Sequence, residues 1–432
     1  MSKRRIATVA VNVAVLVVLA EGVSLAIYYI QNGGLFYVHR KTYRPIPETQ
    51  NQRMTPDALH PYFGPTHRPG HPFSMPATLL NESSPPPATN NFGFVSPHSY
   101  PYSRKRDAEF ILGVFGGSVG VWFCQLGVDP LIASLKQHPA FKGRDVTALC
   151  FSHEGYKQPQ QALVLAYFLS IGQEFDLVLN IDGFNEVALG RLNDQHGLDI
   201  SMPSVMHIDP LINLINQSTL TPDKLESLAR ISRYKRQLNT LADRINQNRI
   251  ASVNFVLEQY FQIVSNRHVA EVYAFARLPS NPSESSLVYV TPKTKKRSDA
   301  ELFDHIARSW ASGSTLMNDL LSARSVPYFH VLQPNQYYTQ RRFAAEEARV
   351  ALNDQSPFKD GVQKGYPILI RMSDNGVWQK NGVRFLDATR ILDREPAPVY
   401  MDDCCHYTRR GNEMLADYIA RTILSSSFPG TR

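Results

Sequence analysis

Four short segments of the chain carry side chains that together could perform acyl transfer. Ser118 directly follows an apolar run, Phe110–Phe115, which is typical of a buried strand ending at the rim of a sheet. A serine hydroxyl is a weak nucleophile and needs a base. His406 could take its proton, and Asp403, three residues before the histidine, could orient and charge-stabilise the imidazole. These residue types predict a Ser-His-Asp triad.

The negative charge that develops on an acyl oxygen needs donors held in place. Gly155 follows the second predicted strand, and Asn185 follows the third. Together with the backbone N–H of Ser118, these two residues could supply the donors. We therefore expect an oxyanion hole made by Ser118, Gly155 and Asn185.

The order and spacing of these segments resemble the four sequence blocks of the SGNH, or GDSL-like, hydrolase family. The resemblance extends over residues 90–190 and 325–425 and not over the stretch between them. It implies an α/β fold with a parallel sheet sandwiched by helices, in the three-layer, flavodoxin-like arrangement of that family. By this resemblance Ser118 is the nucleophile, Gly155 the glycine of the second block and Asn185 the asparagine of the third. Asp403 and His406 form the closing Asp-x-x-His.

Two positions depart from the family pattern. Gly117 stands where the name-giving motif has aspartate, and Glu186 stands where aspartate commonly follows the asparagine. Neither position is a triad member in that family. The Gly-Gly-Ser form of the first block is similar to that of the membrane-anchored bacterial branch.

The same serine lies in a second motif, Gly116-x-Ser118-x-Gly120, which spells the nucleophile elbow of α/β-hydrolases. An elbow normally follows several strands, whereas Ser118 ends the first clear strand. An α/β-hydrolase also has no reason to place its acid three residues from its histidine. The position in the chain therefore favours the SGNH interpretation.

Alternating strand and helix patterns surround these segments and predict a parallel sheet covered on both faces. The predicted strands are residues 110–115, 146–151, 177–181 and 326–332. The helix signals between and after them are an Asp129-Pro130 start, a Pro159 start, a Ser298-x-x-Glu301 capping box and an apolar stripe over residues 414–423.

The N-terminus predicts a membrane anchor. Residues 6–30 are predominantly apolar and long enough to span a bilayer, and Lys3 to Arg5 favour a cytoplasmic N-terminus. We expect a signal anchor over residues 1–30 with residues 31–432 outside the cytoplasm, in the periplasm. The rival is a signal peptide cleaved after Ser24-Leu25-Ala26. Glu21 is expected to be protonated or to snorkel near the outer interface, rather than to contact a membrane partner.

The remaining chain divides by composition. Residues 31–108 are rich in Pro, His, Asn and Ser and predict a stalk or wrapping segment, whose His60, His67 and His71 are expected to be solvated rather than metal ligands. Residues 109–425 form the predicted catalytic domain. A helical insertion is expected at residues 190–297, with a basic helix from Thr221 that is either a lid for an anionic substrate or a solvated face.

The net charge and the cysteine content limit the binding partners, disulfides and metal sites that the sequence allows. Residues 31–432 carry a net charge of +5, from 42 Lys and Arg against 37 Asp and Glu. This mild excess suits an anionic envelope polymer or lipid surface, and without a dense basic run it does not suggest nucleic acid. Two states of the cysteines are compatible with the sequence. Cys124 could form a disulfide with Cys404 or Cys405, or all the cysteines, Cys150 included, could be buried free thiols. Zinc is less favoured because no second His/Cys pair appears at ligand spacing. We expect no cofactor and no metal.

Three functions fit these observations. The first is a membrane-anchored, extracytoplasmic serine esterase that removes acyl groups, most plausibly acetyl, from an envelope glycan or lipid. The second is an O-acyltransferase that passes the same acyl-enzyme to a sugar hydroxyl. The third is a non-catalytic anchored scaffold, which the intact Ser/Gly/Asn/Asp/His set argues against.

Overall fold

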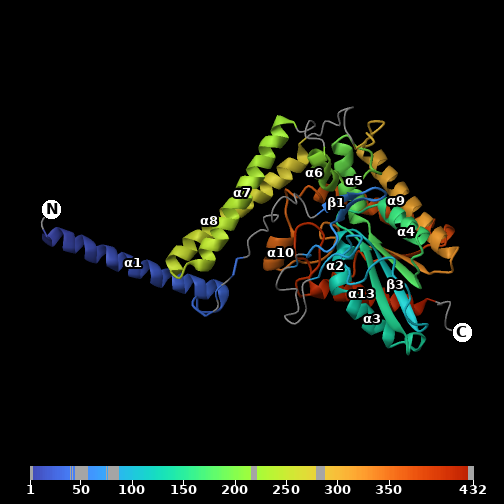
Figure 1. Ribbon diagram of the computed structural model, residues 1–432, viewed down its shortest axis with the longest axis horizontal. Coiled ribbons are helices and arrows are strands. Elements are labelled where there is room, and N and C mark those ends of the chain that lie inside the picture. The colour runs from blue at the N-terminus through green and yellow to red at the C-terminus, as the bar shows by residue number, and fades with distance from the viewer. Residues whose placement is uncertain are drawn as a thin grey trace. The chain divides into compact units, whose positions relative to one another are not determined.

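The structure is a computed structural model, and its residues group into two compact units (Figure 1). One unit comprises Met1–Met54 and Thr219–Asn281, and the other comprises Thr55–Ser218 and Pro282–Arg432. The described residues are 3–38, 40, 42–43, 57–73, 75, 87–215, 221–278 and 288–426.

The larger unit is built on one five-stranded sheet in the order β4-β3-β5-β6-β7, and every neighbouring pair is parallel. This is the doubly wound 2-1-3-4-5 order, which places the ligand site at the carboxyl ends of the strands beside the first strand. The central strands are fully buried, as their apolar sequences predict. The strands are β3 (Glu109–Gly116), β4 (Asp145–Ser152), β5 (Leu177–Asp182), β6 (Tyr328–Leu332) and β7 (Arg384–Asp387).

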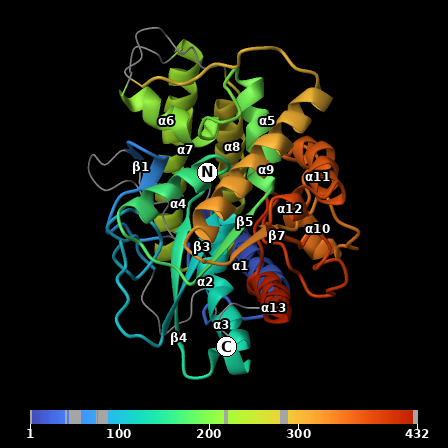
Figure 2. The same cartoon turned by 90° about the vertical axis from the view of Figure 1, so that its right-hand side faces the viewer.

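Two groups of helices cover this sheet (Figure 2). The members of each group contact one another, and right-handed crossovers between parallel strands place them on the two faces. One group is α2 (Ser118–Leu126), α3 (Val128–Lys136) and α13 (Arg409–Ser425). The other is α4 (Gln160–Ser170), α5 (Phe184–Gln195), α9 (Asp299–Ser322) and α11 (Lys359–Asp374). The predicted α/β class, with its parallel sheet and helices, is confirmed.

Local signals placed several helix starts correctly. Ser298 caps α9 and forms the expected capping box with Glu301. The expected Asp129-Pro130 start lies inside α3, whose N-cap is Gly127. Thr408, to which no sequence signal was assigned, caps α13 by accepting a hydrogen bond from the Gly411 N–H. The shorter elements are β1 (Asp57–His60), β2 (Gly64–His67), the 3-10 turn η2 (Pro139–Phe141), α6 (Val205–Ile215), α10 (Ala345–Ala351) and α12 (Val377–Lys380).

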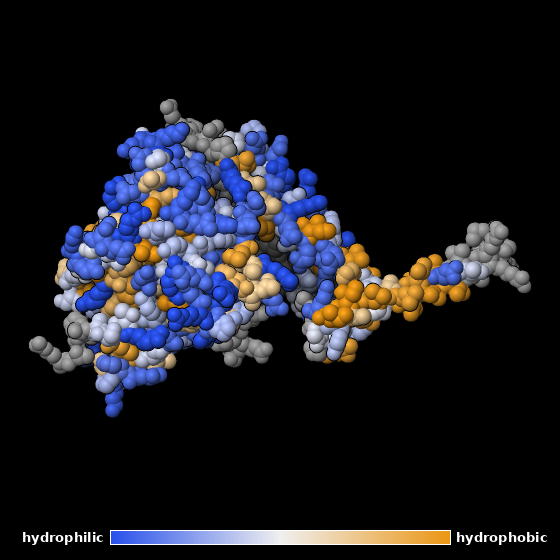
Figure 3. Space-filling view, turned by 180° about the vertical axis from the view of Figure 1, so that it is seen from behind, coloured by the Kyte–Doolittle hydropathy of each residue, from blue (hydrophilic) through white to orange (hydrophobic). Residues whose placement is uncertain are grey.

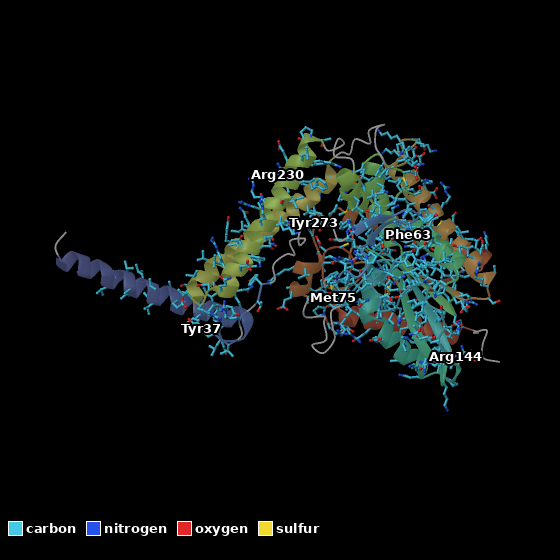
Figure 4. The ribbon with its side chains drawn as sticks, in the orientation of Figure 1. Tyr37, Phe63, Met75, Arg144, Arg230 and Tyr273 are labelled. Carbon is cyan, nitrogen blue, oxygen red and sulfur yellow. A yellow bond between two sulfur atoms is a disulfide. The ribbon has the colours of Figure 1, made fainter. Side chains whose placement is uncertain are left out.

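The described part of residues 57–108 packs on the larger unit instead of standing apart as a stalk. Strands β1 and β2 pair antiparallel, and Phe63 between them is buried (Figure 4). Its ring contacts Tyr167 and Phe168 of α4, while Tyr100 stacks on Phe151 of β4. These aromatic contacts make the segment part of the core, in keeping with the wrapping alternative.

The smaller unit is helical. It contains α1 (Lys3–Asn32), α7 (Pro222–Gln247) and α8 (Ala251–Arg277), with α8 in contact with both of the others. Within α1, Val11–Gln31 is long and apolar enough to cross a membrane, and Figure 3 shows its apolar surface. The predicted insertion at residues 190–297 is therefore divided, because residues 219–281 group with the N-terminal helix while α6 stays with the sheet.

Glu21 in α1 has a structural role that the sequence interpretation missed. Its carboxylate accepts hydrogen bonds from the N–H groups of Ala251 and Ser252, at 2.7 and 2.9 Å, and from the Ser252 hydroxyl. These are the first orphan donors of α8, where a negative charge is favourable. Within this unit Glu21 caps a helix, so the expected snorkelling side chain is wrong.

Candidate active site

Ser118, the predicted nucleophile, lies where β3 passes into α2. Ser118 is the first residue of α2, and its side chain is 8% exposed. The main chain reaches this helix through Gly116 and Gly117, and a Cβ on Gly117 would lie 2.1 Å from Nδ2 of Asn185. No larger side chain fits there without displacing the amide. The departure from aspartate at position 117 therefore has a steric reason in this chain.

Ser118 and His406, 288 residues apart in sequence, meet directly. Nε2 of His406 lies 2.7 Å from Oγ of Ser118, and Nδ1 contacts the carboxylate of Asp402. That carboxylate also accepts the backbone N–H groups of Cys404, Cys405 and His406 through Oδ1, at 3.0 to 3.2 Å. These contacts have the geometry that a nucleophile, a base and an acid that orients the base require.

The carboxylate that contacts His406 is that of Asp402, and not that of Asp403 as predicted. Oδ2 of Asp403 accepts a hydrogen bond from Nδ2 of Asn353 at 2.7 Å, and its carbonyl accepts one from the Tyr337 hydroxyl at 2.8 Å. The physical reason is the turn before His406. Three successive N–H groups converge on the first of two adjacent aspartates, which places the acid four residues before the histidine instead of three.

Electrostatics favour charge on this pair. Burial alone would lower the pKa of His406, but the charge of the Cys405 thiolate and the hydrogen bond with Asp402 outweigh it and raise the pKa well above its usual range. Burial likewise opposes ionisation of Asp402, but the hydrogen bond from His406 outweighs burial and lowers the pKa of the carboxyl. The imidazolium that forms after proton transfer is therefore stabilised.

The predicted oxyanion donors lie on loops that are tied to one another. Nδ2 of Asn185 donates to the carbonyl of Tyr156 at 2.8 Å, which joins the start of α5 to the residue after Gly155. The N–H of His153 donates to the carbonyl of Gly116 at 3.3 Å and joins the same loop to the nucleophile turn. Within the described residues, the N–H groups of Ser118 and Gly155 have no recorded partner, so both can donate to a bound oxyanion.

Glu186, the second position that departs from the family pattern, joins these loops to one another. Its carboxyl oxygens accept the N–H groups of Gln158, at 2.9 Å, and Gly183, at 2.8 Å. Burial and the neighbouring Asp182 carboxylate raise the pKa of Glu186 to about 8. The side chain thus links the Gly155 loop to the helix that carries Asn185, without reaching toward the nucleophile.

A buried ion pair supports the chain that leads into the histidine loop. The guanidinium of Arg341 bonds Glu347 and the carbonyls of Leu392 and Ala397, and both side chains are at most 1% exposed. Oε1 of Glu347 accepts the N–H of Val399 at 2.7 Å. Such a pair is costly to break on one side, because the remaining charge is left buried. No sequence motif indicated it.

The cysteines pair differently from the prediction. A disulfide joins Cys124 of α2 to Cys150 of β4, so the expected bridge from Cys124 to Cys404 or Cys405 is wrong. The helix that carries Ser118 packs on β4, which brings these two Cα atoms to 6.0 Å. Cys404 and Cys405 are free thiols with their sulfur atoms 3.1 Å apart. The disulfide therefore fastens the nucleophile helix and not the histidine loop.

The structure thus brings together four of the five residues assigned from sequence, Ser118, Gly155, Asn185 and His406, around one edge of the sheet, and replaces the fifth. The adjacent aspartates were the signal for Asp402, but spacing alone could not choose between them. The chain matches no protein-family model, and no curated protein matches it significantly.

Proposed function

We propose that this chain is a serine esterase of the SGNH type that cleaves O-acyl bonds through Ser118, His406 and Asp402. The observation that carries the proposal is the contact of 2.7 Å between Oγ of Ser118 and Nε2 of His406. A serine with an aligned imidazole, in turn oriented by a carboxylate, is the arrangement that activates a hydroxyl. The strand-to-helix position of the serine at the carboxyl edge of a doubly wound sheet supports it further.

The reaction follows from these contacts. His406 takes the proton from Ser118 as Oγ attacks the carbonyl carbon of the ester, and Asp402 stabilises the resulting imidazolium. The N–H groups of Ser118 and Gly155 and the amide of Asn185 stabilise the oxyanion. His406 then gives its proton to the leaving alcohol, which departs and leaves an acyl-enzyme on Ser118. A water molecule, deprotonated by His406, attacks the carbonyl carbon of this ester. The bond to Oγ of Ser118 then breaks, Oγ takes the proton back from His406, and the free acid leaves.

The substrate proposal rests on the N-terminal helix. Val11–Gln31 can span a membrane, so we place the enzyme at an envelope membrane, with the basic N-terminus in the cytoplasm and residues 31–432 in the periplasm. An acyl group, most plausibly acetyl, on an envelope glycan or lipid would then be within reach. The helix would act as an anchor, and protease added to intact spheroplasts should then digest the larger unit.

An apolar wall beside the base favours O-acyl transfer as the second candidate. The ring of Trp122 lies 6.1 Å from that of His406, and Phe73 packs on Trp122 at 5.9 Å. Apolar rings exclude water, and water exclusion lets a sugar hydroxyl compete for the acyl-enzyme. The nucleophile, base and oxyanion donors would be the same.

Mass spectrometry of the detergent-solubilised full chain with acetylated glycans, with and without an acceptor sugar, tests the proposal. An esterase releases acetate in both samples, whereas a transferase acetylates the acceptor. Both activities should disappear in Ser118→Ala. Acetyl release that is equal in the wild type and in Ser118→Ala would contradict both candidates.

A further inference from the structure

A second group of acidic and imidazole side chains lies in the larger unit, apart from the triad. It is formed by Asp57 of β1, His67 of β2, and His153 and Glu154 directly after β4, and we call these four residues the β2 cluster. His67 is only 12% exposed and His153 only 1%. The expectation of a solvated His67 is therefore wrong, and the mechanism proposed above uses none of these groups.

The contacts inside the β2 cluster are unusual for a simple ion-pair network. Nδ1 of His67 lies 2.7 Å from Oδ1 of Asp57 in good hydrogen-bond geometry. On the other side of the ring, Nε2 lies 2.9 Å from Oε2 of Glu154, yet both atoms are buried without an aligned hydrogen bond. His153 repeats the pattern, since Nδ1 contacts the carbonyl of Glu154 at 2.9 Å while Nε2 is buried without a partner.

Buried polar atoms that lack partners call for an explanation, because nearly all such atoms in proteins are paired. Within this cluster two imidazole nitrogens and one carboxylate oxygen have no aligned hydrogen bond, although Nε2 of His67 and Oε2 of Glu154 form an ion pair with each other. A nitrogen and an oxygen that are close but not aligned are what two ligands of one metal ion look like, since ligand distances of about 2.0–2.2 Å hold such atoms about 3 Å apart. Atoms of Asp57, His67 and His153 that could bind a metal lie within 4.8 Å of one another, and Oε2 of Glu154 lies 2.9 Å from Nε2 of His67.

We propose that the β2 cluster binds one divalent transition-metal ion, with Zn²⁺ the best match. The ligands would be one imidazole nitrogen each of His67 and His153 and the carboxylate of Glu154, a ligand set that zinc uses in proteins. His67 would bind through Nε2 while Asp57 holds its other nitrogen, and His153 would bind while the Glu154 carbonyl holds Nδ1. Metal-binding histidines are usually oriented in this way by a carboxylate or a backbone carbonyl.

The position of the β2 cluster gives the ion a role, which rests on the proposed function. Glu154 immediately precedes the oxyanion glycine, Gly155, whose φ is +76°. The ring of His207 packs against Gly155 so closely that a Cβ there would lie 2.3 Å from its Nδ1, a third buried nitrogen without a partner. An ion at the β2 cluster would tie this loop to the β1–β2 hairpin and fix the direction of the Gly155 N–H.

The first test is metal content. The full chain, solubilised in detergent and dialysed against a chelator, is loaded with Zn²⁺, freed of excess metal and assayed by elemental mass spectrometry. We expect about one zinc per chain for the wild type and for His98→Gln, a histidine of the same unit outside the β2 cluster. His67→Gln and His153→Gln should each retain less than a tenth of that zinc. Asp57→Asn should bind zinc about 10- to 100-fold more weakly.

A second readout separates this site from the other group of possible ligands, Cys404, Cys405 and His406. Co²⁺ at the β2 cluster should give the visible bands of a nitrogen- and oxygen-bound ion, unchanged in Cys404→Ser/Cys405→Ser. Strong thiolate charge-transfer absorption that the double variant removes would overturn the proposal. So would a folded wild type that binds no zinc, or zinc content unchanged in folded His67→Gln and His153→Gln. Metal content does not depend on ester hydrolysis, so it fails or succeeds separately from the proposed function.

Discussion

His406 and His67, both in the larger unit, each contact an aspartate through Nδ1. They differ in the group that lies against Nε2. In the triad, Nε2 of His406 faces the hydroxyl of Ser118 at 2.7 Å. In the β2 cluster, Nε2 of His67 faces the carboxylate of Glu154 at 2.9 Å. A hydroxyl can give a proton to the imidazole, whereas a carboxylate cannot. By this account the same Asp-His pair would serve as a general base in one place and would suit a bound cation in the other.

Removal of the Ser118 hydroxyl should have the largest effect on activity. Ser118→Ala should lower kcat for an aryl acetate by about 10⁶-fold, to the background left by the oxyanion donors. The zinc content of the β2 cluster should not change, because Ser118 is not part of it. Steady-state kinetics and metal analysis on one preparation check both. Turnover near that of the wild type would remove Ser118 from the nucleophile role.

Neutralising the carboxylate of Asp402 should have the second-largest effect on activity. Asp402→Asn should lower kcat by about 10⁴-fold, because the amide favours the wrong tautomer of His406. Asp403→Asn is the matched control, one residue away and bonded to Asn353 instead, and it should cost less than about tenfold. Kinetic constants of the two variants, with circular dichroism to establish folding, decide the matter. The opposite order of losses would restore Asp403 as the acid.

Loss of the oxyanion amide should be smaller but specific to the transition state. Asn185→Ala should reduce kcat by about 10²- to 10³-fold with little change in KM, because the amide acts on charge that develops only during the reaction. Asn381→Ala, in the turn after α12, provides a control that should leave both constants unchanged. A change in KM alone would assign Asn185 to ground-state binding.

The smallest expected effect is a shift in pH dependence. Burial raises the pKa of the Cys405 thiol, but the hydrogen bond from Cys404 and the charge of His406 outweigh it and lower the pKa to about 7. The thiolate in turn raises the pKa of His406. Only the neutral imidazole can act as base, so activity should rise with pH through this pKa. Cys405→Ser should move the acidic limb of the pH profile of kcat/KM to lower pH. An unchanged limb would show that the Cys405 thiol does not ionise.

Much of this site could be predicted because strand ends and glycine-rich turns have local sequence signals. Ser118 and Asn185 each follow an apolar strand, and His406 precedes a capped apolar helix. The choice between Asp402 and Asp403 depends on which carboxylate three backbone N–H groups reach, which spacing does not encode. The partner of Cys124 depends on the packing of α2 on β4.

Other parts of the fold lacked a local signal altogether. Strand β7 is four residues long and only partly buried, so its pattern is too short to read. His67 lies in a segment rich in proline and histidine that predicts solvated loops. Aromatic contacts of the nearby Phe63 with Tyr167 nevertheless pack this segment on α4, and the side chain of His67 is only 12% exposed. Contacts between distant segments decided each of these cases.

Active-site labelling tests the central claim most directly. The full chain is treated with a fluorophosphonate, which forms a covalent adduct only with an activated serine, and the adduct is mapped by peptide mass spectrometry. We predict one adduct per chain on Ser118, absent from Ser118→Ala and strongly slowed in Asp402→Asn but not in Asp403→Asn. An unlabelled wild-type protein, or an adduct on another serine, would contradict the account.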